Sequence, residues 1–144
     1  DPDNPGGYRL NLRSRGRALL MLFLFSEVGE RDAPTRVRVG SHRDVPALLA
    51  PYGEDGAGFV AFCAEAVPAT SHRPVSLATG SPGDVYLVHP FLVHAAQPHR
   101  GTTPRFMAQP PLMPAGELDL DAATPVVEAI RDGLAQATPG RVTG

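Results

Sequence analysis

Apolar and polar residues alternate in two stretches of the chain, with the period of strands that bury one face. Residues 8–12 (YRLNL) carry apolar side chains at every second position, and residues 36–39 (RVRV) repeat this pattern. Residues 18–28 (ALLMLFLFSEV) are apolar at almost every position, which predicts a strand buried on both faces. Residues 13–17 (RSRGR) contain a glycine and predict the turn between the first strand and this one.

Further strands follow in the second half of the chain. Residues 74–94 predict a strand, a Pro-Gly turn and a second strand, and residues 105–109 (RFMAQ) predict another short strand. Many short strands with few helices favour a mainly β fold, an antiparallel sandwich or a jelly roll. We expect the helices to lie at its periphery.

Three segments have the pattern of helices, at residues 44–52, 58–66 and 124–137. Asp44 is the expected N-cap of the first helix, which contains a proline in its first turn and ends at a second proline. Thr124 is the expected cap of the last helix, with a proline directly after it at the first helical position. The middle helix is predicted from phenylalanine and alanine residues at helical spacing.

Composition narrows the class of partner. The formal net charge of −2 and the pI near 6.2 argue against nucleic acid and against an anionic membrane surface. The longest apolar run, residues 18–25, is far shorter than the ~20 residues that span a bilayer. A single cysteine, Cys63, excludes an internal disulfide and favours a reducing cytoplasm. The chain begins at Asp1 rather than methionine, so we expect upstream sequence to be missing.

Histidine and arginine are concentrated in residues 89–106 (HPFLVHAAQPHRGTTPRF), directly after an apolar stretch. If residues 85–94 form one unbroken strand, His89 and His94 lie on opposite faces, because side chains alternate along a strand. At most one of them is then expected to bind a metal. A histidine in a strand is more often an ordinary polar residue than a ligand, so the surrounding sequence has to decide.

This stretch resembles the phytanoyl-CoA dioxygenase family of Fe(II)- and 2-oxoglutarate-dependent oxygenases. The family pattern runs from a Gly-Asp turn through an apolar strand to HPxLxH and then to an arginine, and residues 83–106 (GDVYLVHPFLVHAAQPHRGTTPRF) show the same order. The segment RVRVGSH, residues 36–42, is similar to a second family element. The resemblance covers roughly residues 8 to 110.

By position, the resemblance implies roles for three residues. His94 matches the distal iron-binding histidine, Arg105 matches the arginine that binds the distal carboxylate of 2-oxoglutarate, and His89 is a structural residue. The chemistry fits, because neutral imidazole is a good Fe(II) ligand and guanidinium pairs bidentately with carboxylates. The implied cofactors are Fe(II) and 2-oxoglutarate.

The resemblance also implies a second histidine and a carboxylate, arranged as His-X-Asp or His-X-Glu. Within the chain only His42 and Asp44, in HRD, have this spacing. We expect the true pair to lie upstream of residue 1, with His42 and Asp44 as the alternative inside the chain. Asp44 is already explained as a helix cap.

The fold expected from the resemblance is a double-stranded β-helix, that is, a cupin-like jelly roll with peripheral helices that lacks its N-terminal part. Residues 1–110 would form the C-terminal portion of this oxygenase domain. Residues 111–144 would be a linker and a C-terminal helix packed on the same domain.

The function expected is an Fe(II)- and 2-oxoglutarate-dependent dioxygenase that oxidises a small organic substrate with O2. Two alternatives remain open: a degenerate or truncated jelly roll without catalysis, and a metal-dependent cupin enzyme that uses His42, Asp44 and His94 without 2-oxoglutarate. Neither nucleic acid nor a membrane is an expected partner. The sequence does not specify the substrate or the oligomeric state.

Overall fold

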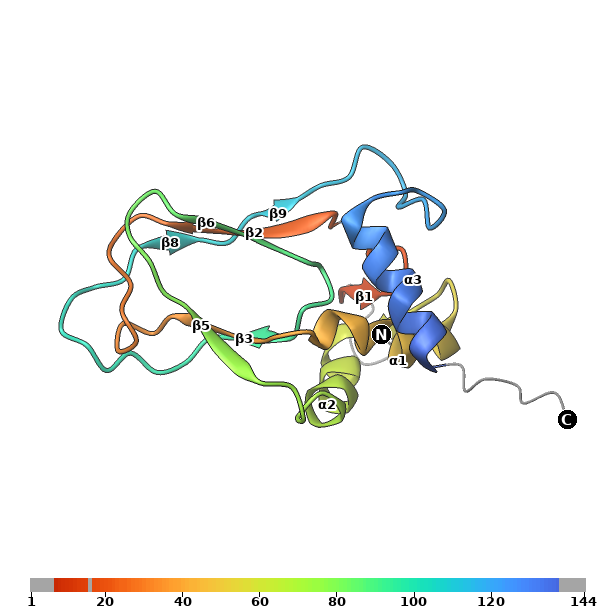
Figure 1. The fold of residues 1–144 in the computed structure, drawn as a ribbon, viewed down its shortest axis with the longest axis horizontal. Coiled ribbons are helices and arrows are strands. Elements are labelled where there is room, and N and C mark those ends of the chain that lie inside the picture. Colours follow the sequence, from red (N-terminus) through yellow and green to blue (C-terminus); the bar gives the residue numbers. More distant parts are fainter. Residues whose placement is uncertain (1–6, 16, 138–144) are drawn as a thin grey trace, which may run out of the picture.

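Two antiparallel sheets lie in two layers, with the helices gathered at one end (Figure 1). The structure is a computed structural model, and it describes residues 7–15 and 17–137. Strands β2, β6, β8 and β9 form one layer, and β3 and β5 lie in the other. This arrangement leaves an interior between the sheets and a second interior among the helices.

The first sheet is built around β2 (Leu19–Leu24). Its neighbour on one side is β6 (Val85–Val88), and β8 (Met107–Ala108) and β9 (Pro111–Leu112) pair with it as well, all antiparallel. The segment expected to be a linker after residue 110 therefore begins with a strand of this sheet.

The second sheet has the order β5-β3-β7. Strand β3 (Thr35–Arg38) is central, between β5 (Val75–Ala78) and β7 (His94–Ala95), and both pairings are antiparallel. Two further short strands, β1 (Arg9–Leu10) and β4 (Ala57–Gly58), pair with each other near the helices. Residues 13–17 consequently do not join two paired strands of one hairpin.

Three α-helices and two short 3₁₀ turns complete the described chain. Their bounds are η1 Ser41–Arg43, α1 Val45–Leu49, η2 Ala50–Tyr52, α2 Phe59–Ala69 and α3 Pro125–Ala137. Helix α3 packs on η1 and α1, and Gly133 makes this close approach possible. A Cβ atom added at Gly133 would lie 2.2 Å from the carbonyl oxygen of Arg43.

A small hydrophobic cluster joins the two sheets. Leu20, Leu22 and Val88 of the first sheet pack with Ala78 of the second. The partly buried side chains around them include Tyr86, Leu92 and Met107. The inward faces of the two sheets thus share one core, as in a sandwich.

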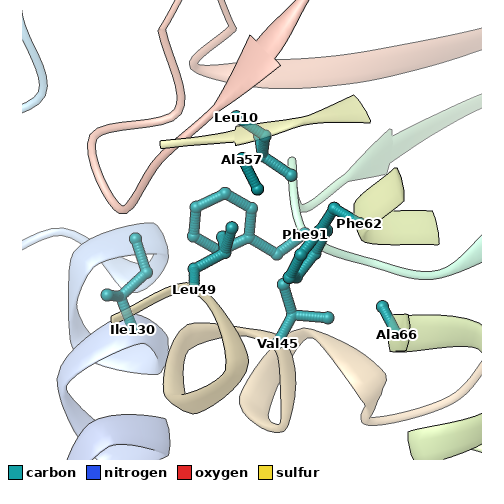
Figure 2. Packing of buried hydrophobic residues seen from close by; sticks show 8 residues of the cluster. All are labelled: Leu10, Val45, Leu49, Ala57, Phe62, Ala66, Phe91 and Ile130. Carbon is teal, nitrogen blue, oxygen red and sulfur yellow. The ribbon is translucent and has the colours of Figure 1, made fainter. Parts of the chain in front are cut away.

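The larger cluster lies among the helices, β1 and β4 (Figure 2). Phe91 stands near its centre and Phe62 reaches it from α2. The buried members are Leu10, Val45, Leu49, Ala57, Phe62, Ala66, Phe91 and Ile130. Helices expected to be peripheral therefore contribute most of the main core, although they do lie at one end of the sheets.

Strand β2 is buried on one face only, so the prediction of two buried faces was wrong. Its residues alternate between partly exposed and buried along Leu19–Leu24, and Phe25 just beyond it is 61% exposed. An apolar run alone does not tell whether a second layer covers it. In the described part of the chain the outward face of this sheet exposes Val85, Leu87, Phe106 and other apolar side chains.

Of the two predicted helix caps, Thr124 is confirmed and Asp44 is wrong. Val127 donates its backbone N–H to the hydroxyl of Thr124 over 3.4 Å, so Thr124 does cap α3. Asp44 makes no side-chain capping hydrogen bond at α1, and its backbone is already helical. Its carboxylate is bound by Arg73 instead, a stronger charge-assisted partner.

Residues 85–94 do not form one strand. Strand β6 ends at Val88, and Leu92 then donates its N–H to the carbonyl of His89 over 3.0 Å, which closes a turn containing Pro90. His94 begins β7 in the other sheet. The simple alternation of faces along a single strand therefore does not relate His89 to His94.

The expectation of a mainly β fold is confirmed at the level of antiparallel sheets with three short helices, and the described residues form no closed barrel. None of the helices in the described ranges combines the length and the apolar character needed to cross a lipid bilayer.

Candidate metal-binding histidine and its cavity

His94 is held at the start of β7, opposite Val37 of β3. Its Nδ1 lies 2.8 Å from the carbonyl oxygen of Leu92, and its Nε2 lies 3.1 Å from the side-chain nitrogen of Gln109. A carbonyl can only accept and an amide NH2 can only donate, so the ring carries its proton on Nδ1. Nε2 then accepts the Gln109 hydrogen bond through its lone pair, and a metal at this atom would take the place of that hydrogen bond.

His94 and Gln109 lie on the wall of a cavity of about 330 Å³. The wall is otherwise formed by apolar side chains of β1, α1, α2 and residues 90–93, together with Arg17. Phe62 and Phe91 link this wall to the main hydrophobic core. A volume at the lower end of the range for ligand pockets, with few polar groups, suits a small organic molecule.

Arg105 lies in the extended segment that leads into β8. Side chains two residues apart share a face of such a segment, so Arg105, Met107 and Gln109 point to the same side. Met107 packs in the cluster between the sheets and Gln109 reaches His94, which identifies that side as inward. The Arg105 guanidinium donates to the carbonyl of Ala33, and no described carboxylate pairs with it.

His89 occupies a different environment from His94. Its Nε2 donates to the carbonyl of Val126 in α3 over 3.1 Å, and its Nδ1 accepts the N–H of Phe91 over 3.1 Å. Both ring nitrogens are therefore used within the fold. Burial lowers the pKa of His89 to about 4, against a smaller opposing effect of the Val126 carbonyl. These contacts tie the 89–91 turn to the start of α3.

The ring of His42 packs at a tilt of 37° against that of His89, with 5.0 Å between the ring centroids. Its Nδ1 is buried and has no hydrogen-bond partner among the described residues. Burial lowers the pKa of His42, and the neighbouring Arg43 and Arg73 act in the same direction. His42 thus belongs to the packed region around His89.

Asp44 is bound by Arg73 through both carboxylate oxygens, at 2.8 Å from Arg73 Nε to Oδ2 and 2.5 Å from Nη2 to Oδ1. His72 lies 3.5 Å from the same carboxylate. The hydrogen bonds from Arg73 lower the pKa of Asp44. Both oxygens are consequently committed to a partly buried ion pair.

The structure does not bring His42, Asp44 and His94 together. Across residues 7–15 and 17–137, no group of three or more histidine, cysteine, aspartate or glutamate side chains could hold a metal ion. A non-haem iron site with two histidines and one carboxylate needs such a group. Of the three candidates, His94 has one ring nitrogen held by a carbonyl and the other at a cavity wall, so the described residues supply one part of a site and do not complete it.

Sequence reasoning missed Gln109 and the cavity. Gln109 is exposed and lies fifteen positions after His94, so nothing local in the sequence connects the two. The one available signal was the alternation of side chains along an extended segment, which puts Gln109 on the same face as Arg105. The cavity results from contacts among distant segments and has no sequence signature.

Comparison with known proteins identifies the family of the chain. The sequence model of the phytanoyl-CoA dioxygenase (PhyH) family matches residues 5–107, and this range contains both His94 and Arg105. Searches of curated proteins and of solved structures gave no significant match. Because the family match extends over well more than half of the sequence, the chain belongs to the phytanoyl-CoA dioxygenase family.

Proposed function

We propose that this chain is part of an Fe(II)- and 2-oxoglutarate-dependent dioxygenase that hydroxylates a small organic substrate. Members of the family generally use Fe(II) and 2-oxoglutarate. The overall reaction would consume 2-oxoglutarate, O2 and a substrate C–H bond, and would yield succinate, CO2 and the alcohol. The iron supplies the oxidising chemistry when bound, and the protein supplies ligands, orientation and exclusion of water.

The observation that carries this proposal is the state of His94. Its Nδ1–H is held by the Leu92 carbonyl, and Nε2 faces Gln109 at the wall of the cavity. An outer hydrogen bond of this kind fixes the ring and makes the other nitrogen a better ligand. We assign His94 as an iron ligand on this basis.

We further propose that the other histidine and the carboxylate lie upstream of residue 1. Asp44 is engaged with Arg73, and His42 is packed on His89, which makes these two residues poor replacements. The jelly-roll fold, with residues 1–110 as its C-terminal portion, is part of the same proposal. So is a cytoplasmic location, in keeping with iron in its reduced form.

Arg105 is proposed to bind the distal carboxylate of 2-oxoglutarate. It shares the inward face of its segment with Gln109, the residue that contacts His94. Its guanidinium is held by a neutral carbonyl, that of Ala33, and no carboxylate within residues 7–15 or 17–137 forms an ion pair with it, so the carboxylate of 2-oxoglutarate would supply an opposite charge.

The test is an anaerobic titration with Fe(II) and 2-oxoglutarate, following the visible charge-transfer band of chelated iron. It uses the full-length protein, meaning this chain with all sequence that its gene encodes before Asp1. We expect the band, and we expect Arg105→Ala to weaken 2-oxoglutarate binding by about 10- to 100-fold, as loss of a charge-assisted bidentate pair does. Arg100→Ala, an exposed arginine of the same segment, is the matched control and should bind normally.

Two results would contradict the proposal. A band that is lost in Asp44→Ala would place the pair at His42 and Asp44, inside the chain. Absence of any band in the folded full-length protein would favour the second candidate, a non-catalytic family member. That candidate draws on one observation, the lack of a three-ligand group among the residues that the structure describes.

A further inference from the structure

Arg17 is the single charged residue on the wall of the cavity beside His94, as far as the structure describes the chain. It comes from the segment that precedes β2, whereas His94 and Gln109 come from β7 and from the residues after β8. The cavity therefore has two polar positions of different character. One is a permanent cation, and the other is a neutral imidazole with its amide partner.

The Arg17 guanidinium is oriented but not neutralised. Its Nε donates to the hydroxyl of Tyr8 over 3.3 Å, and its central carbon lies 4.6 Å from the centre of the Tyr8 ring. No carboxylate of the described residues forms an ion pair with it. Other arginines nearby are engaged, since Arg13 pairs with Glu54 at 3.2 Å.

Arg17 also acts electrostatically on the cavity. Burial raises the pKa of Cys63, another residue of the cavity wall, and the positive charge of Arg17 opposes this rise. The charge is therefore close enough to affect a group inside the cavity. An anion at the same place would gain from this field, because the apolar surroundings screen it less than water does.

Apart from the thiol of Cys63, the remainder of the wall is hydrocarbon and aromatic. Phe62 and Phe91 are almost fully buried and form part of it, and Val45 and Ala66 belong to the same cluster. Such a wall stabilises an apolar chain by removing it from water, at about 25 cal/mol for each Å² buried. It would not favour a ligand that is polar along its whole length.

We propose that the cavity is the binding site for a small amphipathic carboxylate. Arg17 binds the carboxylate, and the aromatic and aliphatic wall holds the hydrocarbon part beside His94. This deepens and rests on the proposed function, because it names the class of the molecule that would be oxidised. Arg17 is then a specificity residue, distinct from Arg105, the residue proposed for 2-oxoglutarate.

The test is binding of octanoate to the metal-free full-length protein, followed by NMR titration of the 15N-labelled chain. The uncharged analogue 1-octanol and the short carboxylate acetate are compared with it. We expect octanoate to bind about tenfold or more tightly than either, since it alone uses both the charge and the apolar wall.

Three variants sharpen this test. Arg17→Gln should reduce the affinity for octanoate to that for 1-octanol and leave 1-octanol binding unchanged. Arg15→Gln is the matched control, because Arg15 is exposed, lies in the same segment and is absent from the cavity wall. Cys63→Leu should fill part of the cavity and weaken both ligands about equally.

The proposal is overturned if octanoate does not bind, if it binds no better than 1-octanol, or if Arg17→Gln keeps the preference. It is also overturned if 2-oxoglutarate displaces octanoate from the metal-free protein and if Arg17→Gln abolishes the binding of 2-oxoglutarate. None of these measurements involves iron. A protein that binds octanoate but no iron would contradict only the proposed function, and the reverse result would contradict only this inference.

Discussion

His89 and His94 lie five positions apart in one motif, yet the structure uses them in opposite ways. His89 has both ring nitrogens bound by the backbone and sits between the helical core and α3. His94 has one nitrogen bound by the backbone and presents the other to Gln109 at a cavity wall. The partner of the second ring nitrogen, more than the motif itself, therefore separates a structural histidine from a candidate ligand.

The turn at residues 89–92 produces this difference. It closes directly after β6, so the chain leaves one sheet before His94 enters the other. The same turn places Phe91 in the main core, and the buried Phe91 ring anchors the turn (Figure 2). His89 is thereby placed at the N-terminal end of α3, and His94 lies in β7, an edge strand of its sheet in the described chain.

The largest expected effect comes from breaking the anchor of the turn. Phe91→Ala removes a ring that is 3% exposed at the centre of the main cluster, and should lower the free energy of unfolding by about 3–5 kcal/mol. His94→Ala should lower it by less than about 1 kcal/mol, since it affects a partly exposed side chain. Urea unfolding monitored by circular dichroism measures both. Equal losses in the two variants would show that the turn is not anchored as described.

The second effect is a dependence of stability on pH that originates at His89. Its folded pKa of about 4 lies below the ordinary value of 6.5, so between these values the unfolded chain binds a proton that the folded chain does not. The free energy of unfolding should therefore fall as the pH drops from 6.5 to 4. The loss from this residue should reach about 2–3 kcal/mol.

His89→Asn should remove most of that loss, because asparagine does not titrate and its oxygen can still accept the N–H of Phe91. His94→Asn is the matched control and should retain the loss. Urea midpoints at pH 7.5 and pH 4.5 make the comparison. An acid-induced loss that is unchanged in His89→Asn would assign it to other groups, His42 among them.

The smallest effect concerns Asp44, the residue predicted from the sequence to cap a helix, with metal binding kept only as an alternative. Asp44→Asn should cost about 1 kcal/mol, because it breaks the bidentate pair with Arg73. This contribution should disappear as the pH falls below 3.8, the ordinary carboxyl pKa, since the folded value is lower. Glu54→Gln, at the more exposed pair with Arg13, should cost almost nothing. Thermal unfolding at pH 7 decides whether Asp44 has this structural role.

The features that could be predicted from the sequence are those that depend on near neighbours. Thr124 caps α3 through a hydrogen bond to a residue three positions away, and the alternation in residues 36–39 does mark a strand. Asp44 shows the limit of this reasoning. Its local context fits a cap, but an arginine twenty-nine positions later competes for the carboxylate and binds it.

The candidate site shows the same division. His94 and Arg105 stand out in the sequence because a motif and a fixed spacing connect them. Gln109 contacts His94 only once the two sheets have packed together, and Arg17 lies on the cavity wall although it is far from His94 in the sequence. Contacts of that range depend on the packing of whole elements, which no local pattern encodes.

The different roles of His89 and His94 are tested most directly by determining which ring nitrogen of each imidazole carries the proton. Long-range 1H–15N NMR of the full-length protein should show His94 protonated on Nδ1 and His89 protonated on Nε2. Added Fe(II) with 2-oxoglutarate, kept anaerobic, should broaden the His94 signals strongly and leave His89 visible. A His94 ring protonated on Nε2, or His94 signals that Fe(II) does not affect, would contradict its assignment as the metal-facing histidine.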